Sequence, residues 1–236
     1  MILYERNWDA ASVTYGLHRM AFKRFFRLLP AAFILLLTPV AAATTEPYRI
    51  VGFGDSLMAG YMLDPGQSFP ERLEAALKAR GHDVVIANAG VSGDTTSGGL
   101  SRLDWSVPDD TDLVILELGA NDMLRGIAPE VTEKNLAAMI ERLQERGIAV
   151  VLAGMVAAPN LGPDYAARFD PIHPRLAATY GLPLYPFFLD GVAAEAGLLL
   201  SDGMHPNAQG VERMVEGFLP VIEAALAGTE TPAAGQ

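Results

Sequence analysis

The sequence contains no cysteine among its 236 residues. This absence excludes disulfides, Cys-ligated zinc, iron–sulfur clusters and thiol nucleophiles, so stability must come from a packed core. Basic residues are also scarce, with 17 Lys and Arg against 28 Asp and Glu and a formal net charge of −11. Binding to a phosphate backbone requires a basic surface. We therefore do not expect nucleic-acid binding to be the main function.

Several cofactor and catalytic motifs are missing as well. The segment 52–57 begins like a dinucleotide-binding fingerprint, but its third glycine is absent. The sequence has no P-loop, no His-Glu-x-x-His motif and no Gly-x-Ser-x-Gly turn of the larger α/β-hydrolases. These absences argue against a nicotinamide site, a P-loop nucleotide site and a zinc-protease site.

The N-terminal part has the pattern of a targeting segment. Three basic residues between Met20 and Leu28 precede an apolar run that ends at Val40, and three alanines follow, up to Ala43. This layout is typical of a secretory signal peptide, and the run of 13 residues is shorter than the roughly 20 that a spanning helix requires. We expect cleavage after Ala43, export across the inner membrane and a periplasmic location. A retained N-terminal anchor is the alternative.

The domain boundaries follow from this segment. Residues 1–43 are interpreted as an upstream extension plus signal peptide, residues 44–228 as one domain, and residues 229–236 as a disordered tail. Residues 44–236 keep 12 of the 17 basic and 26 of the 28 acidic residues, which gives a net charge of −14. A domain of this length can bury a sizeable core without disulfides. We expect it to act as a monomer.

Short β-rich runs alternate with helical patterns along the domain. Runs rich in Val, Ile and Leu predict four buried strands, and a fifth short strand is expected at 182–184. The predicted strands are 49–53, 84–87, 113–118 and 148–153. Helical spacing at 69–77 and 136–143 ends at glycines, and a last helix is expected from Ala208 to about Leu226 with Asn207 as its cap. The alternation predicts an α/β fold with a parallel sheet between two helical layers.

Polar segments follow the predicted strands and precede the last helix. Ligands of such sheets bind outside the carboxyl ends of the strands, so these segments should meet at one edge. The segments are Gly54-Asp55-Ser56-Leu57, Asn88 to Asp94, Gly119-Ala120-Asn121-Asp122 and Asp202-Gly203-Met204-His205-Pro206.

The residue types in these segments are those that acyl transfer requires. A serine hydroxyl becomes a good nucleophile when an imidazole takes its proton, and a carboxylate holds the imidazole in the correct tautomer. Ser56, His205 and Asp202 can fill these roles. The backbone N–H groups of Ser56 and Gly93 and the side-chain amide of Asn121 are candidate donors to the developing oxyanion.

In the order and spacing of these four polar segments, the chain resembles the SGNH or GDSL hydrolases. The resemblance covers nearly all of residues 48–226 and is greatest to the bacterial branch of acyl-CoA thioesterase I, arylesterases and lysophospholipases. It implies a three-layer α/β/α, flavodoxin-like fold with a five-stranded parallel sheet, and neither metal nor organic cofactor. It also implies that Ser56, Asp202 and His205 are catalytic and that Ser56, Gly93 and Asn121 form the oxyanion hole.

Apolar residues near these segments are candidates to line an acyl groove, although an equally good interpretation places most of them in the core. They are Met58, Met123, Leu124, Ile127, Met155 and Val156. Met58 stands where this branch commonly has Ser, so it could narrow the site. Asp55 and Glu117 are expected to be structural supports, since an unpaired carboxylate in a buried strand is costly. His173 is a rival base, but it lies outside the four segments that carry the resemblance.

The resulting hypothesis is a serine hydrolase that cleaves aryl, acyl-lipid or acyl-thio esters of short to medium acyl chains through an acyl-enzyme. Its substrates would be small-molecule esters or acyl lipids. Carbohydrate O-acetyl esterase activity is the alternative, and a non-catalytic lipid- or glycan-binding module is a further one. The presence of Ser56, Gly93, Asn121 and His205 together argues against the binding module.

Overall fold

A computed structural model of the chain describes residues 46–229. Its centre is a five-stranded sheet in the order β2-β1-β3-β4-β5, and every neighbouring pair of strands is parallel. The strands are β1 (Tyr48–Gly54), β2 (Val84–Gly90), β3 (Leu113–Glu117), β4 (Ala149–Ala153) and β5 (Leu184–Tyr185). The predicted five-stranded parallel sheet is confirmed, with the fifth strand shifted towards Tyr185.

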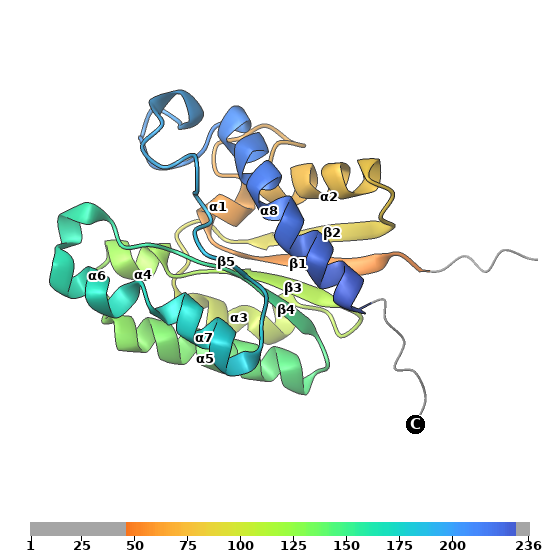
Figure 1. Cartoon of the computed structure of the whole chain (residues 1–236), viewed down its shortest axis with the longest axis horizontal. Helices are drawn as coiled ribbons and strands as arrows, with labels where there is room; N and C mark the ends of the chain where they lie inside the picture. Colours follow the sequence, from red (N-terminus) through yellow and green to blue (C-terminus); the bar gives the residue numbers. More distant parts are fainter. Residues whose placement is uncertain (1–45, 230–236) are drawn as a thin grey trace, which may run out of the picture. The chain divides into compact units, whose positions relative to one another are not determined.

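Helices cover both faces of this sheet. Figure 1 shows α2 and α8 on one face and α3, α5 and α7 on the other, and contacts between α2 and α8, α3 and α5, and α5 and α7 agree with this arrangement. The helices are α1 (Ser56–Ala59), α2 (Phe69–Ala79), α3 (Thr96–Ser106), α4 (Ala120–Leu124), α5 (Pro129–Glu145), α6 (Pro163–Phe169), α7 (Ile172–Tyr180) and α8 (Ala208–Thr229). Two 3₁₀ turns, η1 (Pro159–Leu161) and η2 (Ala196–Leu198), lie in connecting segments. The three-layer α/β/α fold is thus confirmed.

The central strands are buried as their composition indicates, but β2 is not. All five residues of β3 are buried, because helices pack on both of its faces. In β2, Val84 and Ile86 are buried while Val85 is 44% exposed. The expectation that this strand would be buried on both faces is wrong, because β2 lies at the edge of the sheet and only one of its faces is covered by a helix.

The last helix begins as its sequence predicts. The Oδ1 atom of Asn207 accepts hydrogen bonds from the backbone N–H groups of Gln209 and Gly210, both at 3.0 Å. Its Nδ2 atom donates to the carbonyl of Gly197 at 2.9 Å. A capping side chain therefore starts α8 and also ties the preceding loop to it. That loop carries Asp202 and His205.

Parts of the expected domain organisation lie outside the described residues. These are the upstream extension and signal peptide at 1–43, and all of the expected tail except Thr229, with which α8 ends. Within residues 46–229, no helix combines the length and the apolarity needed to cross a membrane.

The edge position of β2 leads to a stability prediction. Val151 of β4 is fully buried, whereas Val85 of β2 is 44% exposed. Removing two methyl groups from a packed site costs their transfer free energy plus a cavity term, so Val151→Ala should lower the free energy of unfolding by about 2 kcal/mol or more. The matched Val85→Ala should cost less than about 1 kcal/mol. Urea denaturation of both variants measures the difference, and equal losses would contradict the placement of β2.

Candidate active site

The carboxyl edge of the sheet brings Ser56 and His205 together from opposite ends of the domain. Ser56 is the first residue of α1, directly after β1, and it is 9% exposed. His205 lies in the loop between η2 and α8. Its Nε2 atom is 2.8 Å from the Oγ atom of Ser56, across a separation of 149 residues. The hydroxyl and the imidazole are therefore in direct hydrogen-bond contact.

Asp202 holds the other side of the imidazole. Its Oδ2 atom is 2.7 Å from Nδ1 of His205, while its Oδ1 atom accepts from the backbone N–H groups of His205 and Met204 at 3.0 and 2.9 Å. These backbone donors, followed by the imidazole, lower the pKa of Asp202 to about 2. Asp202 is thus ionised at neutral pH and favours the tautomer in which Nδ1 carries the proton. The Nε2 atom is then free to accept the proton of the Ser56 hydroxyl.

Short-range contacts fix the loop that carries this pair. The carbonyl of His205 accepts from the N–H of Leu200 at 2.7 Å, and an antiparallel bridge joins Leu199 to Pro206. Gly203, between Asp202 and His205, has a φ of 69°, in the left-handed region that favours glycine. The loop therefore folds back on itself so that the carboxylate and the imidazole of one short segment can meet.

Gly93 and Asn121 lie in the loops that follow β2 and β3. Gly93 has a φ of 81°, and its carbonyl accepts from Nη2 of Arg125 at 2.6 Å. The Nδ2 atom of Asn121 donates to Oδ2 of Asp55 at 3.0 Å. Within the described part of the chain, the backbone N–H groups of Ser56 and Gly93 have no acceptor. These donors are thus available to an external oxygen.

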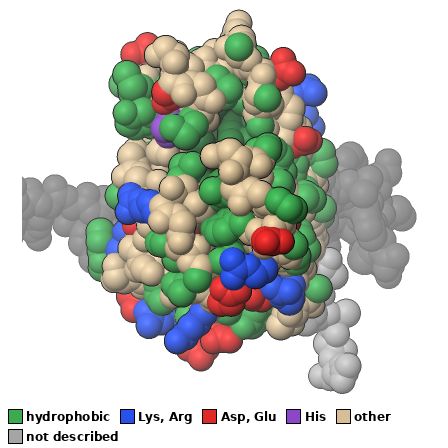
Figure 2. Space-filling view, turned by 90° about the vertical axis from the view of Figure 1, so that its left-hand side faces the viewer, with side chains coloured by type: hydrophobic (Ala, Val, Ile, Leu, Met, Phe, Trp, Pro, Cys, Tyr) green, Lys and Arg blue, Asp and Glu red, His purple; other side chains and the backbone are tan. Residues whose placement is uncertain are grey.

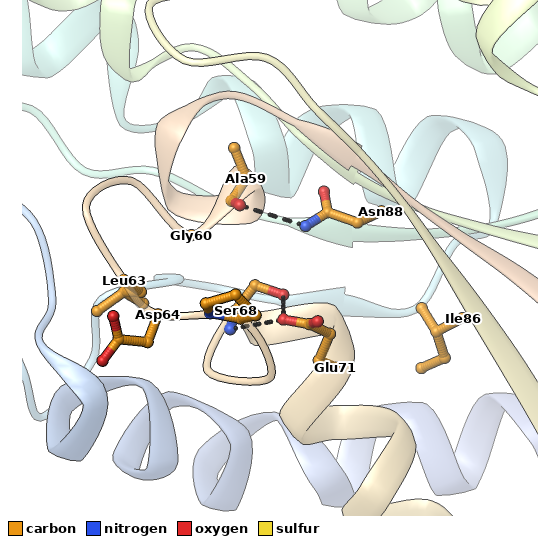
Figure 3. Close-up of a pocket in the computed structure, with 9 residues that line it drawn as sticks. Ala59, Gly60, Leu63, Asp64, Ser68, Glu71, Ile86 and Asn88 are labelled. Carbon is orange, nitrogen blue, oxygen red and sulfur yellow. Dashed lines mark hydrogen bonds between the residues drawn. The ribbon is translucent and has the colours of Figure 1, made fainter.

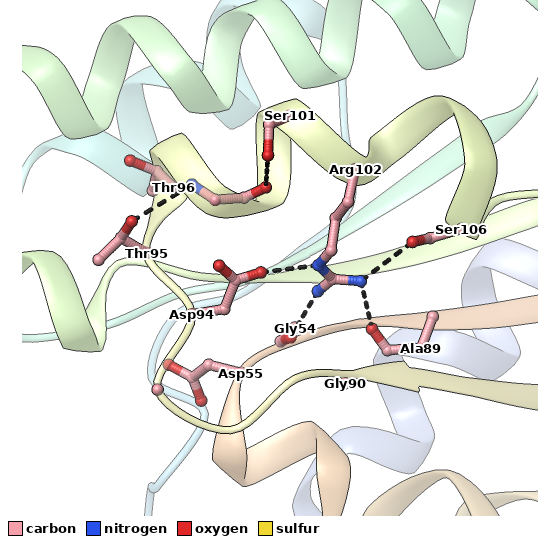
Figure 4. A network of polar contacts seen from close by, with 12 residues as sticks. Gly54, Asp55, Ala89, Gly90, Asp94, Thr95, Thr96, Ser101, Arg102 and Ser106 are labelled. Atoms are coloured by element: carbon pink, nitrogen blue, oxygen red, sulfur yellow. Dashed lines mark hydrogen bonds and ion pairs between the residues drawn. The ribbon is translucent and has the colours of Figure 1, made fainter.

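An arginine that the sequence analysis did not single out fixes the loop carrying Gly93. Arg102 of α3 is 6% exposed, its Nε atom donates to Asp94 at 2.7 Å, and its guanidinium also donates to the carbonyls of Gly54 at 2.9 Å and Ala89 at 2.8 Å (Figure 4). It lies 4.0 Å from the centre of the Phe53 ring. One side chain thus joins the ends of β1 and β2 to the Gly93 loop. An arginine within a polar segment is usually solvent-exposed, so the sequence alone did not indicate this role.

Two further residues at the site were missed or undervalued. Asp122 is fully buried and accepts hydrogen bonds from the backbone and hydroxyl of Thr96 and from the Thr132 hydroxyl, so it anchors the start of α3. The ring centroid of Tyr61 lies 4.5 Å from that of His205, with the rings tilted by 39°. An isolated Tyr in a loop gave no reason to expect a contact with the imidazole.

The candidate groove residues divide into buried and exposed groups. Met58 is fully buried and packs beside Gly52 and Pro70, so it belongs to the core and the expectation that it lines a groove is wrong. Met155 and Met123 are 3% and 7% exposed. Leu124 and Val156 are 55% and 42% exposed and Ile127 is half-buried, so these side chains can reach a bound molecule.

Exposed apolar residues recur in the loops at this edge. Figure 2 looks onto it and shows apolar side chains gathered around a histidine that reaches the surface. Each connection that leaves the carboxyl edge contributes at least one such residue. These residues are Tyr61, Val91, Leu124, Val156 and Met204, and we call them the apolar rim. The rim makes this edge suitable for a partly apolar substrate.

A separate cavity of about 460 Å³ lies beside α1, between the 60–68 loop, the start of α2 and β2 (Figure 3). Glu71 of its wall accepts hydrogen bonds from the backbone and hydroxyl of Ser68 at 3.1 and 2.6 Å. Its lining does not include Ser56, Asp202 or His205. The lining residues are Ala59, Gly60, Leu63, Asp64, Pro65, Ser68, Glu71, Ile86 and Asn88. Among residues 46–229, no cluster of three or more His, Asp or Glu side chains is arranged to hold a metal ion.

The rival base, His173, is a fully buried residue of α7 and packs beside the ends of β3 and β4. Its Nδ1 atom accepts from the N–H of Met155 at 3.4 Å, and its Nε2 atom lies 3.3 Å from the carbonyl of Leu118. Burial lowers its pKa to about 4. Both ring nitrogens are occupied by backbone groups, so His173 braces the ends of two strands and does not act as a base for Ser56.

Comparisons of the sequence with known proteins agree on one family. Residues 53–213 match the GDSL-like lipase/acylhydrolase family. An arylesterase of Vibrio mimicus is 39% identical over 177 residues, which is 75% of this chain and 88% of that protein. The thioesterase 1/protease 1/lysophospholipase L1 of Escherichia coli strain K12 is 34% identical over 190 residues, covering 80% and 88%.

A solved structure agrees with these relatives. The crystal structure of AlinE4, an SGNH-hydrolase family esterase, has 47% sequence identity and a TM-score of 0.65. The match covers 78% of this chain and 99% of that one. Sequence and structure comparisons thus point to the same group of ester-hydrolysing proteins.

The buried imidazole of His173 predicts a pH dependence of stability. Because its pKa falls from 6.5 in the unfolded chain to about 4 in the folded one, the stability it provides is complete above pH 6.5 and is lost as the pH falls towards 4. The total loss is about 3 kcal/mol. In His173→Gln, which stays neutral, the free energy of unfolding should fall less steeply over this interval. Urea titrations at several pH values test this, and parallel slopes for the two proteins would contradict it.

Proposed function

The chain belongs to the GDSL-like lipase/acylhydrolase family and is an ester-hydrolysing enzyme, and we propose that Ser56, His205 and Asp202 are its catalytic triad. The observation that carries this proposal is the unbroken chain of contacts from the Ser56 hydroxyl to His205 at 2.8 Å and from His205 to Asp202 at 2.7 Å. A serine, an imidazole and a carboxylate in this order can activate a hydroxyl as a nucleophile.

The reaction proceeds in two acyl transfers. The Ser56 Oγ atom attacks the carbonyl carbon of the ester while its proton passes to Nε2 of His205. The imidazolium, stabilised by the Asp202 carboxylate, then gives this proton to the leaving oxygen or sulfur, which departs and leaves an acyl-serine. Water, deprotonated by His205, attacks the acyl-serine, and Ser56 recovers its proton as the acid is released.

The negative charge on the tetrahedral carbonyl oxygen requires prearranged donors. We assign this role to the backbone N–H groups of Ser56 and Gly93 and to the side-chain amide of Asn121. The support is that both N–H groups lack an acceptor within residues 46–229, and that Asp55 fixes the Asn121 amide at 3.0 Å. Loss of one such donor typically lowers the rate by about a hundredfold to a thousandfold.

The apolar rim supports acyl esters of short to medium chain length as substrates. Leu124 and Val156 are 55% and 42% exposed, so they can contact an acyl chain beside Ser56 without rearrangement of the core. Thioesters are included, because attack at the carbonyl carbon is the same for both. Sugar acetates are the alternative substrate class, for which the exposed ring of Tyr61 beside His205 offers one stacking surface.

The nucleophile and the acyl preference can be tested together on p-nitrophenyl esters from acetyl to palmitoyl. Ser56→Ala should lower kcat on the order of 10⁶-fold, as happens when a catalytic serine is removed, while circular dichroism stays unchanged. Ser101→Ala, at an exposed serine on α3, is the matched control and should keep parental activity. The parent should prefer short to medium chains. Activity confined to acetate would favour sugar acetates, and full activity of Ser56→Ala would refute the assignment.

Export is the second part of the proposal. It is supported by the sequence alone, through the basic residues, the apolar run and the alanines that end at Ala43. Full-length protein produced in a Gram-negative host should be recovered from the periplasm with Thr44 as its first residue. Intact-mass measurement checks this, and an uncleaved chain in the membrane fraction would indicate a retained anchor instead.

A further inference from the structure

Two carboxyl groups lie together directly beneath the nucleophile. Asp55 follows β1 and Glu117 ends β3, the neighbouring strand, and both side chains are fully buried. The Oε2 atom of Glu117 accepts a hydrogen bond from the backbone N–H of Asp55 at 3.1 Å. Its Oε1 atom is buried and receives no hydrogen bond from a donor in the part of the chain that the structure describes. The catalytic cycle written above uses neither carboxyl group.

The Glu117 side chain packs closely against the end of β1. A methyl group on Gly54 would overlap Oε2 of Glu117 and would lie 2.7 Å from the Glu117 carbonyl. Glycine at position 54 therefore leaves the space that the Glu117 carboxyl occupies. The two carboxyls are in hydrogen-bond contact with each other.

Such a pair cannot be doubly ionised in a buried site, because each charge opposes the other and neither is hydrated. Apart from Glu117, the titratable group that acts on Asp55 is His205, and the nearby Arg102 is already paired with Asp94. Burial raises the pKa of Asp55, because the charged form is not hydrated. Hydrogen bonds from Leu57 and Asn121 offset part of this rise, and the resulting pKa is about 6. Burial and the Asp55 charge raise the pKa of Glu117 well above its usual value. Asp55 accepts hydrogen bonds from two donors, whereas Glu117 accepts from one and its Oε1 atom from none, so the single proton of the pair belongs to Glu117 at neutral pH.

The two carboxylate oxygens of Asp55 accept hydrogen bonds from two different segments of the candidate oxyanion site. Oδ1 accepts from the backbone N–H of Leu57 at 3.0 Å and so caps α1, which begins with Ser56. Oδ2 accepts from Nδ2 of Asn121 at 3.0 Å. An anionic acceptor holds both donors more firmly than a neutral one. The charge on Asp55 thus controls the placement of the Ser56 peptide and the Asn121 amide.

We propose that Glu117 is a protonated acid that donates its hydroxyl to the Asp55 carboxylate, and that this proton-sharing pair is a positioning element of the oxyanion site. Glu117 acts through Asp55 and does not touch the substrate. Its proton is kept through the cycle and is not delivered to the leaving group. Its consequence for catalysis rests on the triad proposed above, but its protonation state does not.

Infrared difference spectroscopy tests the protonation state without any substrate. The spectrum of the parent minus that of Glu117→Gln, in deuterium oxide at neutral pH, should contain the carbonyl stretch of a protonated carboxylic acid. A difference spectrum with carboxylate bands in its place would show that Glu117 is ionised and would overturn the proposal. This result would leave the assignment of Ser56, His205 and Asp202 unaffected.

The positioning role is tested by kinetics on a p-nitrophenyl ester of short chain. Glutamine keeps a donor for Asp55 and an acceptor for its backbone N–H, so Glu117→Gln should retain most of the kcat that Glu117→Ala loses. For the alanine variant we expect kcat to fall about 10-fold to 100-fold, part of the effect of losing an oxyanion donor, with KM little changed. Leu116→Ala, at a buried neighbour on the same strand, is the control that loses stability but not kcat.

The outcomes separate the two proposals. Equal losses of kcat in the glutamine and alanine variants, or parental kcat in a folded Glu117→Ala, would overturn the positioning role. An inactive parent on every ester would instead count against the triad. If Glu117→Ala does not fold, the infrared measurement and the glutamine variant still decide the question.

Discussion

The buried carboxylate of Asp55 is the contact on which the rest of the site depends. The carboxylate caps the helix that begins with Ser56 and fixes the amide of Asn121. The backbone N–H of the same residue ties the end of β1 to Glu117 on β3. Burying a carboxylate away from water costs free energy unless hydrogen-bond donors in the protein replace the water. Here backbone and side-chain donors from adjacent strand-end loops satisfy it, so the free-energy cost of burying one group is offset by contacts that place the proposed nucleophile and oxyanion donors.

The parallel sheet makes this convergence possible. Because the carboxyl ends of its strands share one edge, loops that are far apart in the sequence meet there without a second domain. Arg102 adds stiffness from α3, joining the ends of β1 and β2 to Asp94. His205 and Asp202 come from a single loop before α8, and their contact is local. The two halves of the proposed triad are thus assembled differently: Ser56 is placed by the sheet, and His205 with Asp202 by a short turn.

Features governed by local pattern were predictable from the sequence, such as the runs that form β1, β3 and β4 and the Asn207 cap of α8. Residue type and order at the strand ends were enough to propose Ser56, Gly93, Asn121, Asp202 and His205 as site residues, and the structure brings Ser56, His205 and Asp202 into contact. Long-range packing was not predictable. The exposure of Val85 depends on strand order, the burial of Met58 depends on how α1 lies on β1, and α3 was missed because Gly98 and Gly99 interrupt its helical pattern. The contacts of Arg102 and Tyr61 likewise exist only in three dimensions.

The central claim is that His205 and Asp202 activate one hydroxyl, that of Ser56. Its most direct test is covalent trapping with a fluorophosphonate, followed by mass spectrometry of the intact protein and of its peptides. We predict a single adduct per chain, located on Ser56, and a much slower reaction in His205→Ala. An adduct on another residue, or labelling of Ser56 that is independent of His205, would contradict the account.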